Sequence, residues 1–265
     1  MATTEQIPTT SVRAPGRLAE IARVTGRSRY YAVDGERLPS VTSILSSVWP
    51  KPALYGWYAK RGRESLAAYL APSVGETLTA EMLAEAVAEA KTRPQAEADE
   101  AADLGSQAHD LILRELTNEP VPVPATLKMV MGAFRAWQRE ERLVLVDAEV
   151  AVYHQGDPNA QSYAGTIDAL FRRADGSLLL VDWKTSNGTY PDHLVQAEGY
   201  RQALTWLMAE PDVRIDAQVV RLGKSEPTFE VTDVPNLAGA WDAALAFYSE
   251  YKANGGGKRG GKRGG

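Results

Sequence analysis

The stretch SLLLVDWKTS (177–186) contains an apolar run that ends in an acid and a lysine. A short apolar run bounded by turn residues is typical of a buried strand. Residues two apart in a strand share a face, so Asp182 and Lys184 are expected on one side and Trp183 on the other. Charged groups at the end of a buried strand are costly unless they meet a metal ion, a substrate or each other. The segment therefore predicts a charged functional site.

A second acid, Asp168, lies in the preceding predicted strand, SYAGTIDALFRR (162–173). A two-residue turn would pair Asp168 with Trp183 and put the two acids on opposite faces, whereas a three-residue loop over 174–176 would pair it with Asp182. Gly176 stands where the three-residue loop needs a left-handed residue, which favours the second register. The β-carbons of the two acids would then be about 4.5 to 5.5 Å apart, and a divalent cation would relieve their repulsion.

The rest of the sequence divides into a helical half and a mixed half. Asp34-Gly35 predicts a β-turn, and Pro39-Ser40 the entry to a helix. Helical signals run over about 53–116, with Thr79 capping a helix that stops before Pro94 and a second helix over about 94–116, and again over 125–142. The mixed half predicts strands at 143–154, 162–173 and 177–186, helices at 193–209 and 236–252, and a hairpin between these helices.

Composition limits the class of protein. With 265 residues and 44% apolar residues, the chain is long enough for one to two globular domains. We expect a flexible segment over 1–26, a single domain over 27–253 whose helical part ends near 142, and a flexible basic Gly/Lys/Arg tail over 254–265. No apolar run is long enough to span a membrane, and the first residues lack a secretory signal, so a cytoplasmic location is expected. The absence of cysteine excludes disulfides and iron–sulphur clusters. The net charge of -5 argues against a protein that coats polyanions, but not against a local nucleic-acid groove.

Four short motifs occur in a fixed order: Gly-Ser-x-x-His ending at His109, Gly-x-x-Asp ending at Asp168, Asp-x-Lys over 182–184, and Gln-x-x-x-Tyr from Gln196 to Tyr200. With their helix, strand, strand and helix context, they resemble the RecB-like branch of the PD-(D/E)XK nuclease superfamily. The resemblance covers about 104–207 and extends weakly to LPSVTSIL and the Trp57 segment. It implies an α/β fold with a restriction-endonuclease-like core, in which helices flank a mixed central sheet.

The resemblance also implies roles for individual residues. It makes Asp168 and Asp182 ligands of Mg²⁺ or Mn²⁺, with the backbone carbonyl of Trp183 as a further ligand and His109 beside the metal. Lys184 would orient the attacking water and stabilise charge on the phosphate, and Gln196 and Tyr200 would brace the site or contact the nucleic-acid backbone. Further candidates are an additional acidic metal position, Glu149, and nucleic-acid contacts at Thr185, Ser186, Tyr200, Trp57 and Lys60.

The implied function is a Mg²⁺- or Mn²⁺-dependent deoxyribonuclease that hydrolyses phosphodiester bonds, with a stand-alone exonuclease of phage or mobile-element recombination and repair as the nearest picture. Its expected partner is DNA, with a single-strand annealing or recombination protein as a candidate second partner; the sequence leaves an oligomer open. Two departures matter: Ile167 replaces the proline of the superfamily's name, and the lack of cysteine assigns the chain to a cluster-free branch. A structure-specific endonuclease or nickase, and a non-catalytic nucleic-acid-binding or scaffold protein of the same fold, remain as alternatives.

Overall fold

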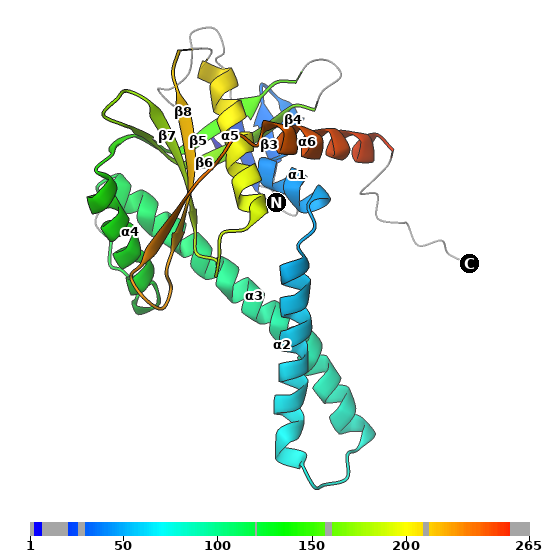
Figure 1. The fold of residues 1–265 in the computed structure, drawn as a ribbon. Coiled ribbons are helices and arrows are strands. Elements are labelled where there is room, and N and C mark those ends of the chain that lie inside the picture. The colour runs from blue at the N-terminus through cyan, green and yellow to red at the C-terminus, as the bar shows by residue number, and fades with distance from the viewer. Residues whose placement is uncertain are drawn as a thin grey trace. The chain divides into compact units, whose positions relative to one another are not determined.

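A computed structural model describes residues 3–6, 21–25, 30–119, 121–156, 161–208 and 212–254 (Figure 1). The chain divides into a larger unit, formed by 1–49 and 109–265, and a smaller unit over 50–108. The single domain that we expected over 27–253 stays a prediction. The expected tail, apart from Asn254, and most of the expected N-terminal segment lie outside the described residues.

The larger unit contains a five-stranded sheet in the order β5-β6-β7-β8-β9. Its strands are β5 (Val144–His154), β6 (Tyr163–Arg172), β7 (Leu178–Lys184), β8 (Ile215–Leu222) and β9 (Phe229–Asp233). Only the β7–β8 pair is parallel, because helix α5 (Pro191–Met208) crosses from one of these strands to the other. A mixed sheet with flanking helices confirms the α/β class.

Alternation along β7 gives the sheet two different faces. One face carries Trp183, whose ring packs edge-on against Phe134 and Trp137 of α4 (Lys128–Glu141), with ring centroids 5.4 and 4.7 Å apart. A short 3-10 turn, η2 (Ala125–Leu127), precedes α4. The other face carries Leu180 and forms the main core with α1 (Val41–Val48), α5 and α6 (Ala238–Ala253) (Figure 1). Asp182 shares this second face, because it is two residues from Leu180.

A second, four-stranded sheet has the order β1-β2-β3-β4 and comprises β1 (Thr3–Gln6), β2 (Ile21–Thr25), β3 (Tyr30–Val33) and β4 (Glu36–Leu38). The turn between β3 and β4 is the predicted Asp34-Gly35, whose φ angles of 48° and 81° are the left-handed values of a tight hairpin turn. The sequence did not predict β1 and β2, which lie in the segment expected to be flexible.

Helix α1 begins where the sequence predicted it. Ser40 is the N-cap, and its Oγ accepts a hydrogen bond of 3.0 Å from the backbone N–H of Ser43. Immediately before it, the carbonyl of Pro39 accepts a hydrogen bond of 3.0 Å from the N–H of Ala164. This bond joins the start of α1 to the strand that carries Asp168.

The smaller unit contains α2 (Pro52–Leu70), a 3-10 turn η1 (Ala71–Ser73) and the first part of α3 (Ala80–Leu116), a helix whose residues from His109 onward belong to the larger unit. The predicted helix break at Pro94 is wrong, because α3 is one helix of 37 residues with Pro94 inside it. Pro94 has no N–H to donate to the carbonyl of Ala90. That carbonyl faces α2, where it would lie 3.1 Å from a Cβ added at Gly62. The two helices thus approach each other closely beside Pro94.

None of the helices in the described ranges has both the length and the apolar character needed to cross a membrane.

Candidate functional site

The loop between β6 and β7 brings the two predicted acids together. The N–H of Arg173 donates to the carbonyl of Ser177 (2.9 Å), which closes a three-residue loop, and Gly176 has the expected left-handed φ of 86°. The ladder pairs Arg172 with Leu178 and continues to Ala169 and Val181. One step further, this register sets Asp168 opposite Asp182. The register that the turn residues favoured is confirmed, and both acids lie on the α5 face of the sheet.

The two strands separate at this step, which opens space between them. By the parity of the ladder, the N–H of Trp183 would donate to Ile167 if pairing continued; instead it donates to Oδ2 of Asp168 at 2.8 Å. A strand residue points its N–H and its C=O to the same side, so the Trp183 carbonyl also faces the gap. Asp168 therefore replaces a backbone acceptor and anchors the end of β7.

His109 supplies a counter-charge to Asp168. Its Nδ1 lies 3.4 Å from Oδ1 of Asp168. The attraction of the carboxylate outweighs partial burial and raises the pKa of the imidazole to about 9. Burial opposes ionisation of Asp168, but His109, Lys184 and the Trp183 N–H together hold the pKa of Asp168 below its ordinary value. Asp168 is thus a stable anion with a cation beside it.

Asp182 is more deeply buried, at 2% exposure. Its Oδ1 accepts a hydrogen bond of 3.1 Å from Nε2 of Gln196. Its Oδ2 forms a close ion pair with Nζ of Lys184, at 2.6 Å. Burial and the nearby Asp168 raise the pKa of Asp182 to about 6, although the ammonium opposes this change. For Lys184, the two carboxylates outweigh the effect of burial, and the pKa rises above its usual value.

Helix α5 contributes a short relay of polar groups. The amide of Gln196 donates one proton to Asp182 and the other to the hydroxyl of Tyr200, at 3.0 Å, so both of its amide protons are used. Burial raises the pKa of Tyr200 well above its ordinary range, so the phenol remains neutral. Its ring fills the space above Gly165, where an added Cβ would lie 3.0 Å from Cδ1 and closer still to Cε1. Only a glycine at position 165, in the Gly-x-x-Asp motif, leaves room for the ring of Tyr200 in the Gln-x-x-x-Tyr motif.

Glu149 lies next to these acids in the sheet. The β5–β6 pairs on either side of it, Ala148 with Ala169 and Val150 with Ile167, set it opposite Asp168. Its φ of 51° is left-handed, which is unusual and unfavourable for a non-glycine residue in a strand. Such strain is found most often at functional positions, and this is consistent with the additional acidic position that the sequence predicted.

The predicted nucleic-acid contacts have mixed surroundings. Ser186 uses its hydroxyl proton locally, since Oγ donates to the carbonyl of Gly188 at 2.7 Å. Thr185 is half-buried directly after β7. In the smaller unit, Lys60 lies 3.8 Å from Glu64, and the ring of Trp57 packs edge-on against Tyr58. Because the placement of the smaller unit is undetermined, the structure leaves Trp57 and Lys60 as predictions.

The acids form a candidate site for a divalent cation, although no three His, Asp or Glu side chains in the described ranges are arranged as a metal-ligand group. A buried carboxylate, a partly buried one and a backbone carbonyl are the hard oxygen ligands that Mg²⁺ and Mn²⁺ prefer, and water completes such sites. The buried carboxylate of Asp182 already has a positive charge beside it, the ammonium of Lys184 at 2.6 Å, so its surroundings favour cations. Because the carboxylate of Asp168 raises the pKa of His109 to about 9, the protonated imidazole is favoured and is a counter-ion to Asp168.

Two contacts near the site were missed by the sequence analysis. The hydroxyls of Tyr31 and Thr166 lie 2.8 Å apart and join the second sheet to β6 between Gly165 and Asp168. Asp192, an acid in the first turn of α5, contributes to the raised pKa of Lys184. Its position four residues before Gln196 is the signal that could have identified it, because residues four apart share a helix face.

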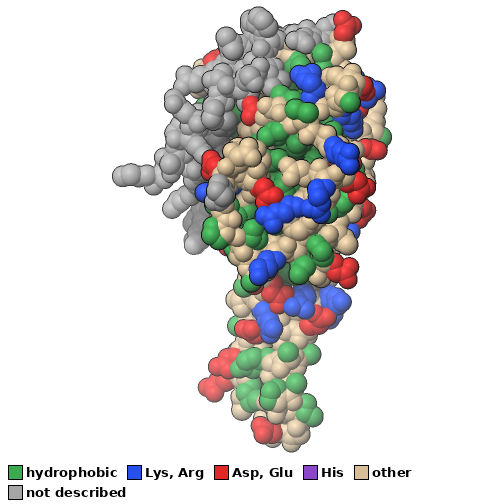
Figure 2. All heavy atoms as spheres, turned by 90° about the vertical axis from the view of Figure 1, so that its left-hand side faces the viewer, with side chains coloured by type: hydrophobic (Ala, Val, Ile, Leu, Met, Phe, Trp, Pro, Cys, Tyr) green, Lys and Arg blue, Asp and Glu red, His purple; other side chains and the backbone are tan. Residues whose placement is uncertain are grey.

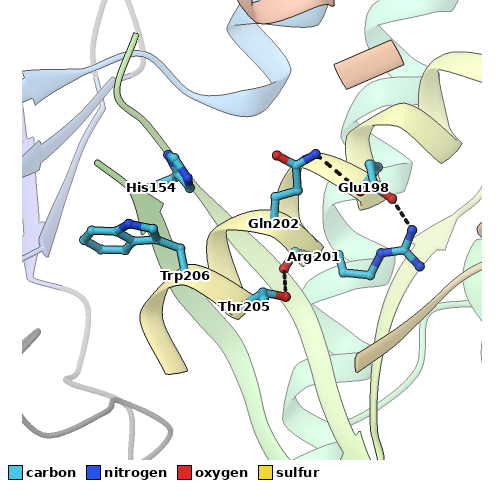
Figure 3. A pocket seen from close by; sticks show the side chains of 6 residues that line it. All are labelled: His154, Glu198, Arg201, Gln202, Thr205 and Trp206. Atoms are coloured by element: carbon cyan, nitrogen blue, oxygen red, sulfur yellow. Dashed lines mark hydrogen bonds and ion pairs between the residues drawn. The ribbon is translucent and has the colours of Figure 1, made fainter. Parts of the chain in front are cut away.

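A separate cavity of about 390 Å³ lies along another side of α5 (Figure 3). It is lined by His154, Glu198, Arg201, Gln202, Thr205 and Trp206. Glu198 is 3% exposed and pairs with Arg201, which also donates to the carbonyls of Val234 and Pro235. This ion pair ties α5 to the segment that leads into α6, so we interpret it as structural.

Comparisons with known proteins do not assign a family. No family model and no curated protein matches the chain. Among solved structures, the protein titled SSO0001 is similar at 14% identity, with a TM-score of 0.31, over 49% of this chain and 59% of that one. This chain thus spans less than two thirds of that protein, and a similarity of this size carries no argument about function.

Proposed function

We propose that this chain is a divalent-metal-dependent DNA nuclease of the RecB-like PD-(D/E)XK type. The observation that carries the proposal is the convergence of Asp168, Asp182 and Lys184 on one face of the sheet where β6 and β7 separate. These three groups come from two strands. A third element, α5, contributes Gln196, which donates a hydrogen bond to the carboxylate of Asp182. Two carboxylates with an adjacent lysine are better explained as a site for phosphodiester hydrolysis than as a purely structural ion pair.

The carboxylates of Asp168 and Asp182, with the Trp183 carbonyl, would hold Mg²⁺ or Mn²⁺. When bound, such an ion supplies a water with a lowered pKa and neutralises charge on the phosphate. The protein's contribution is to hold the ligands in place. Gln196 orients one carboxylate through Oδ1, and the N–H of Trp183 orients the other through Oδ2.

Lys184 has a second role in this proposal. Its side chain is 18% exposed, so the ammonium lies at the boundary between the buried acids and solvent. Because its pKa is raised, it carries a full positive charge at neutral pH. From this position it would stabilise the charge of a scissile phosphate and orient the attacking water.

The surface charge is compatible with a local DNA groove. Basic and acidic side chains are interspersed on the face shown in Figure 2. Several arginines at or near the ends of strands β6 and β8 are already paired with acids, among them Arg173 and Arg214 with Asp216, and Arg221 with Glu230. Paired arginines attract phosphates weakly, so DNA binding should depend on the groups around the acids. An exonuclease is the form that the family resemblance favours.

The test is a digestion assay with end-labelled linear DNA and with closed circular DNA, in Mg²⁺ or Mn²⁺. We expect wild-type protein to degrade the linear DNA, and EDTA to stop the reaction. Lys184→Ala should reduce cleavage by at least about 100-fold, the usual size of the effect of a transition-state charge contact, while folding and DNA binding are largely retained. Asp182→Asn should weaken Mn²⁺ binding as well as cleavage.

The matched control is Lys224→Ala, which removes an exposed lysine of the β8–β9 turn. It should cleave like wild type. Cleavage of circular DNA would instead support the endonuclease or nickase alternative. DNA binding without cleavage in any metal would support the non-catalytic alternative. Full activity in Lys184→Ala would contradict the role given to that lysine.

A further inference from the structure

Asp192 is an acid in the first turn of α5 that the proposed mechanism does not use. Its helix is the crossover between two parallel strands, so α5 runs antiparallel to β7. Gln196 of this helix contacts Asp182 of β7. One turn back along α5 reaches Asp192, about 6 Å away, and two residues forward along β7 reaches Lys184, about 6.6 Å away. Because the helix and the strand are antiparallel, the step from Gln196 to Asp192 and the step from Asp182 to Lys184 point the same way and are nearly equal in length. Asp192 therefore lies on the Lys184 side of the site.

The charge distribution agrees with this placement. Asp192 joins Asp182 and Asp168 in raising the pKa of Lys184, and it is half-buried. The ammonium therefore has carboxylates on two elements within electrostatic reach: Asp182 on its own strand, at 2.6 Å, and Asp192 on the helix.

The short distance to Asp182 creates a conflict for metal binding. An ammonium at 2.6 Å from Asp182 would repel a divalent cation bound to the same carboxylate. If the cation binds, the ammonium must move away from Oδ2. A largely buried ammonium that loses its counter-ion is strongly disfavoured, so it needs another acid within reach.

We propose that Asp192 is a positioning residue that receives the ammonium of Lys184 when a divalent cation binds at Asp182. This inference rests on the proposed function, because it assumes a cation at the two acids. It predicts that Asp192 promotes metal binding through Lys184 and keeps the ammonium beside the metal for the reaction. The alternative is a purely structural role, in which Asp192 only stabilises the first turn of α5, where acids interact well with the helix dipole.

The test is Mn²⁺ binding, measured by calorimetry without DNA, on wild type, Asp192→Asn, Lys184→Ala and the double variant. We expect Asp192→Asn to weaken Mn²⁺ binding about tenfold in the wild-type background, as is typical of coupled sites. In the Lys184→Ala background the same substitution should change the affinity by no more than about twofold. Asp192→Glu should restore part of the affinity.

Two results would overturn the inference. If Asp192→Asn binds Mn²⁺ as wild type does, the acid does not assist the metal. If it weakens binding equally in both backgrounds, it acts by simple attraction of the cation and not through the lysine. If Asp192 interacts only with the helix dipole, Asp192→Asn should lower the melting temperature in chelator by the same amount whether residue 184 is lysine or alanine. Asp212→Asn, at an exposed position before β8, controls for the loss of one negative charge.

The outcome separates this inference from the proposed function. Absence of Mn²⁺ binding by wild type would overturn both. Binding of Mn²⁺ without cleavage of any DNA would overturn the nuclease proposal, while the coupling between Asp192 and Lys184 could still be measured and would still decide the inference.

Discussion

Substituting Gly165 by alanine tests whether the β6 part and the α5 part of the site depend on the packing of the Tyr200 ring against Gly165. The new Cβ would lie 3.0 Å from Cδ1 of Tyr200 and closer to Cε1. Since carbon atoms in contact are about 3.5–4.0 Å apart, the ring must retreat by roughly 1 Å. Its hydroxyl is held by Gln196 at 3.0 Å, so the same movement would stretch this hydrogen bond beyond its working range.

The cost follows from these two effects. Overpacking of a core site costs about 1–3 kcal/mol, and the lost hydrogen bond adds about 1 kcal/mol. We expect the free energy of unfolding to fall by about 2–4 kcal/mol, which lowers the melting temperature by roughly 5–15 °C for a unit of this size. Thermal and urea melts in chelator measure this fall. Because Gln196 also orients Asp182, Mn²⁺ affinity should fall with stability.

Two further variants make the test decisive. Tyr200→Leu removes the ring that the new methyl group meets, so Gly165→Ala should cost much less in that background. Gly239→Ala is the matched control: it adds the same methyl group in open space near the start of α6 and should be neutral or slightly stabilising. The reasoning is refuted if Gly165→Ala melts like wild type, or if its cost is unchanged when Tyr200 is leucine.

Three other substitutions follow from burial and charge. The folded-state pKa of Asp182, about 6, lies above the ordinary value of 3.8, so its contribution to stability is present below about pH 4 and is lost as the pH rises through 6. In chelator, Asp182→Asn should therefore remove most of this fall in the free energy of unfolding, which is on the order of 3 kcal/mol. An equal pH dependence in wild type and in the variant would contradict this prediction. Gly199→Ala places a methyl group 3.0–3.1 Å from the Trp241 ring and should cost about 1–3 kcal/mol in urea unfolding with Mn²⁺ affinity unchanged. Arg201→Met leaves the buried Glu198 without its cation and should cost about 3–5 kcal/mol in the same assay, whereas adding Glu198→Gln should recover much of that stability.

The core of the site could be predicted from the sequence because local chemistry fixed the register. Gly176 is in the left-handed conformation that a three-residue loop needs, and parity along the two strands then determines which face each acid occupies. The N-cap at Ser40 and the turn at Asp34-Gly35 were predictable for the same reason. In each case a few neighbouring residues decide the conformation.

Features that depend on distant contacts could not be predicted. Pro94 is a sound local signal for the end of a helix, but the partner helix across from Ala90 outweighs it. Strands β1 and β2 have no apolar alternation to reveal them.

Each acid of the site has a cation of the protein beside it. Asp168 and Asp182 repel each other, and burying both would be prohibitive if each did not have its own cation, His109 for the first and Lys184 for the second. A divalent ion held by both carboxylates would be a stronger partner than either protein cation, because it carries twice the charge. A cation that binds both acids must therefore displace a charge that the fold itself supplied. The strength of metal binding should then depend on where the displaced ammonium can go, and this makes the acids around Lys184 as important to the site as its ligands.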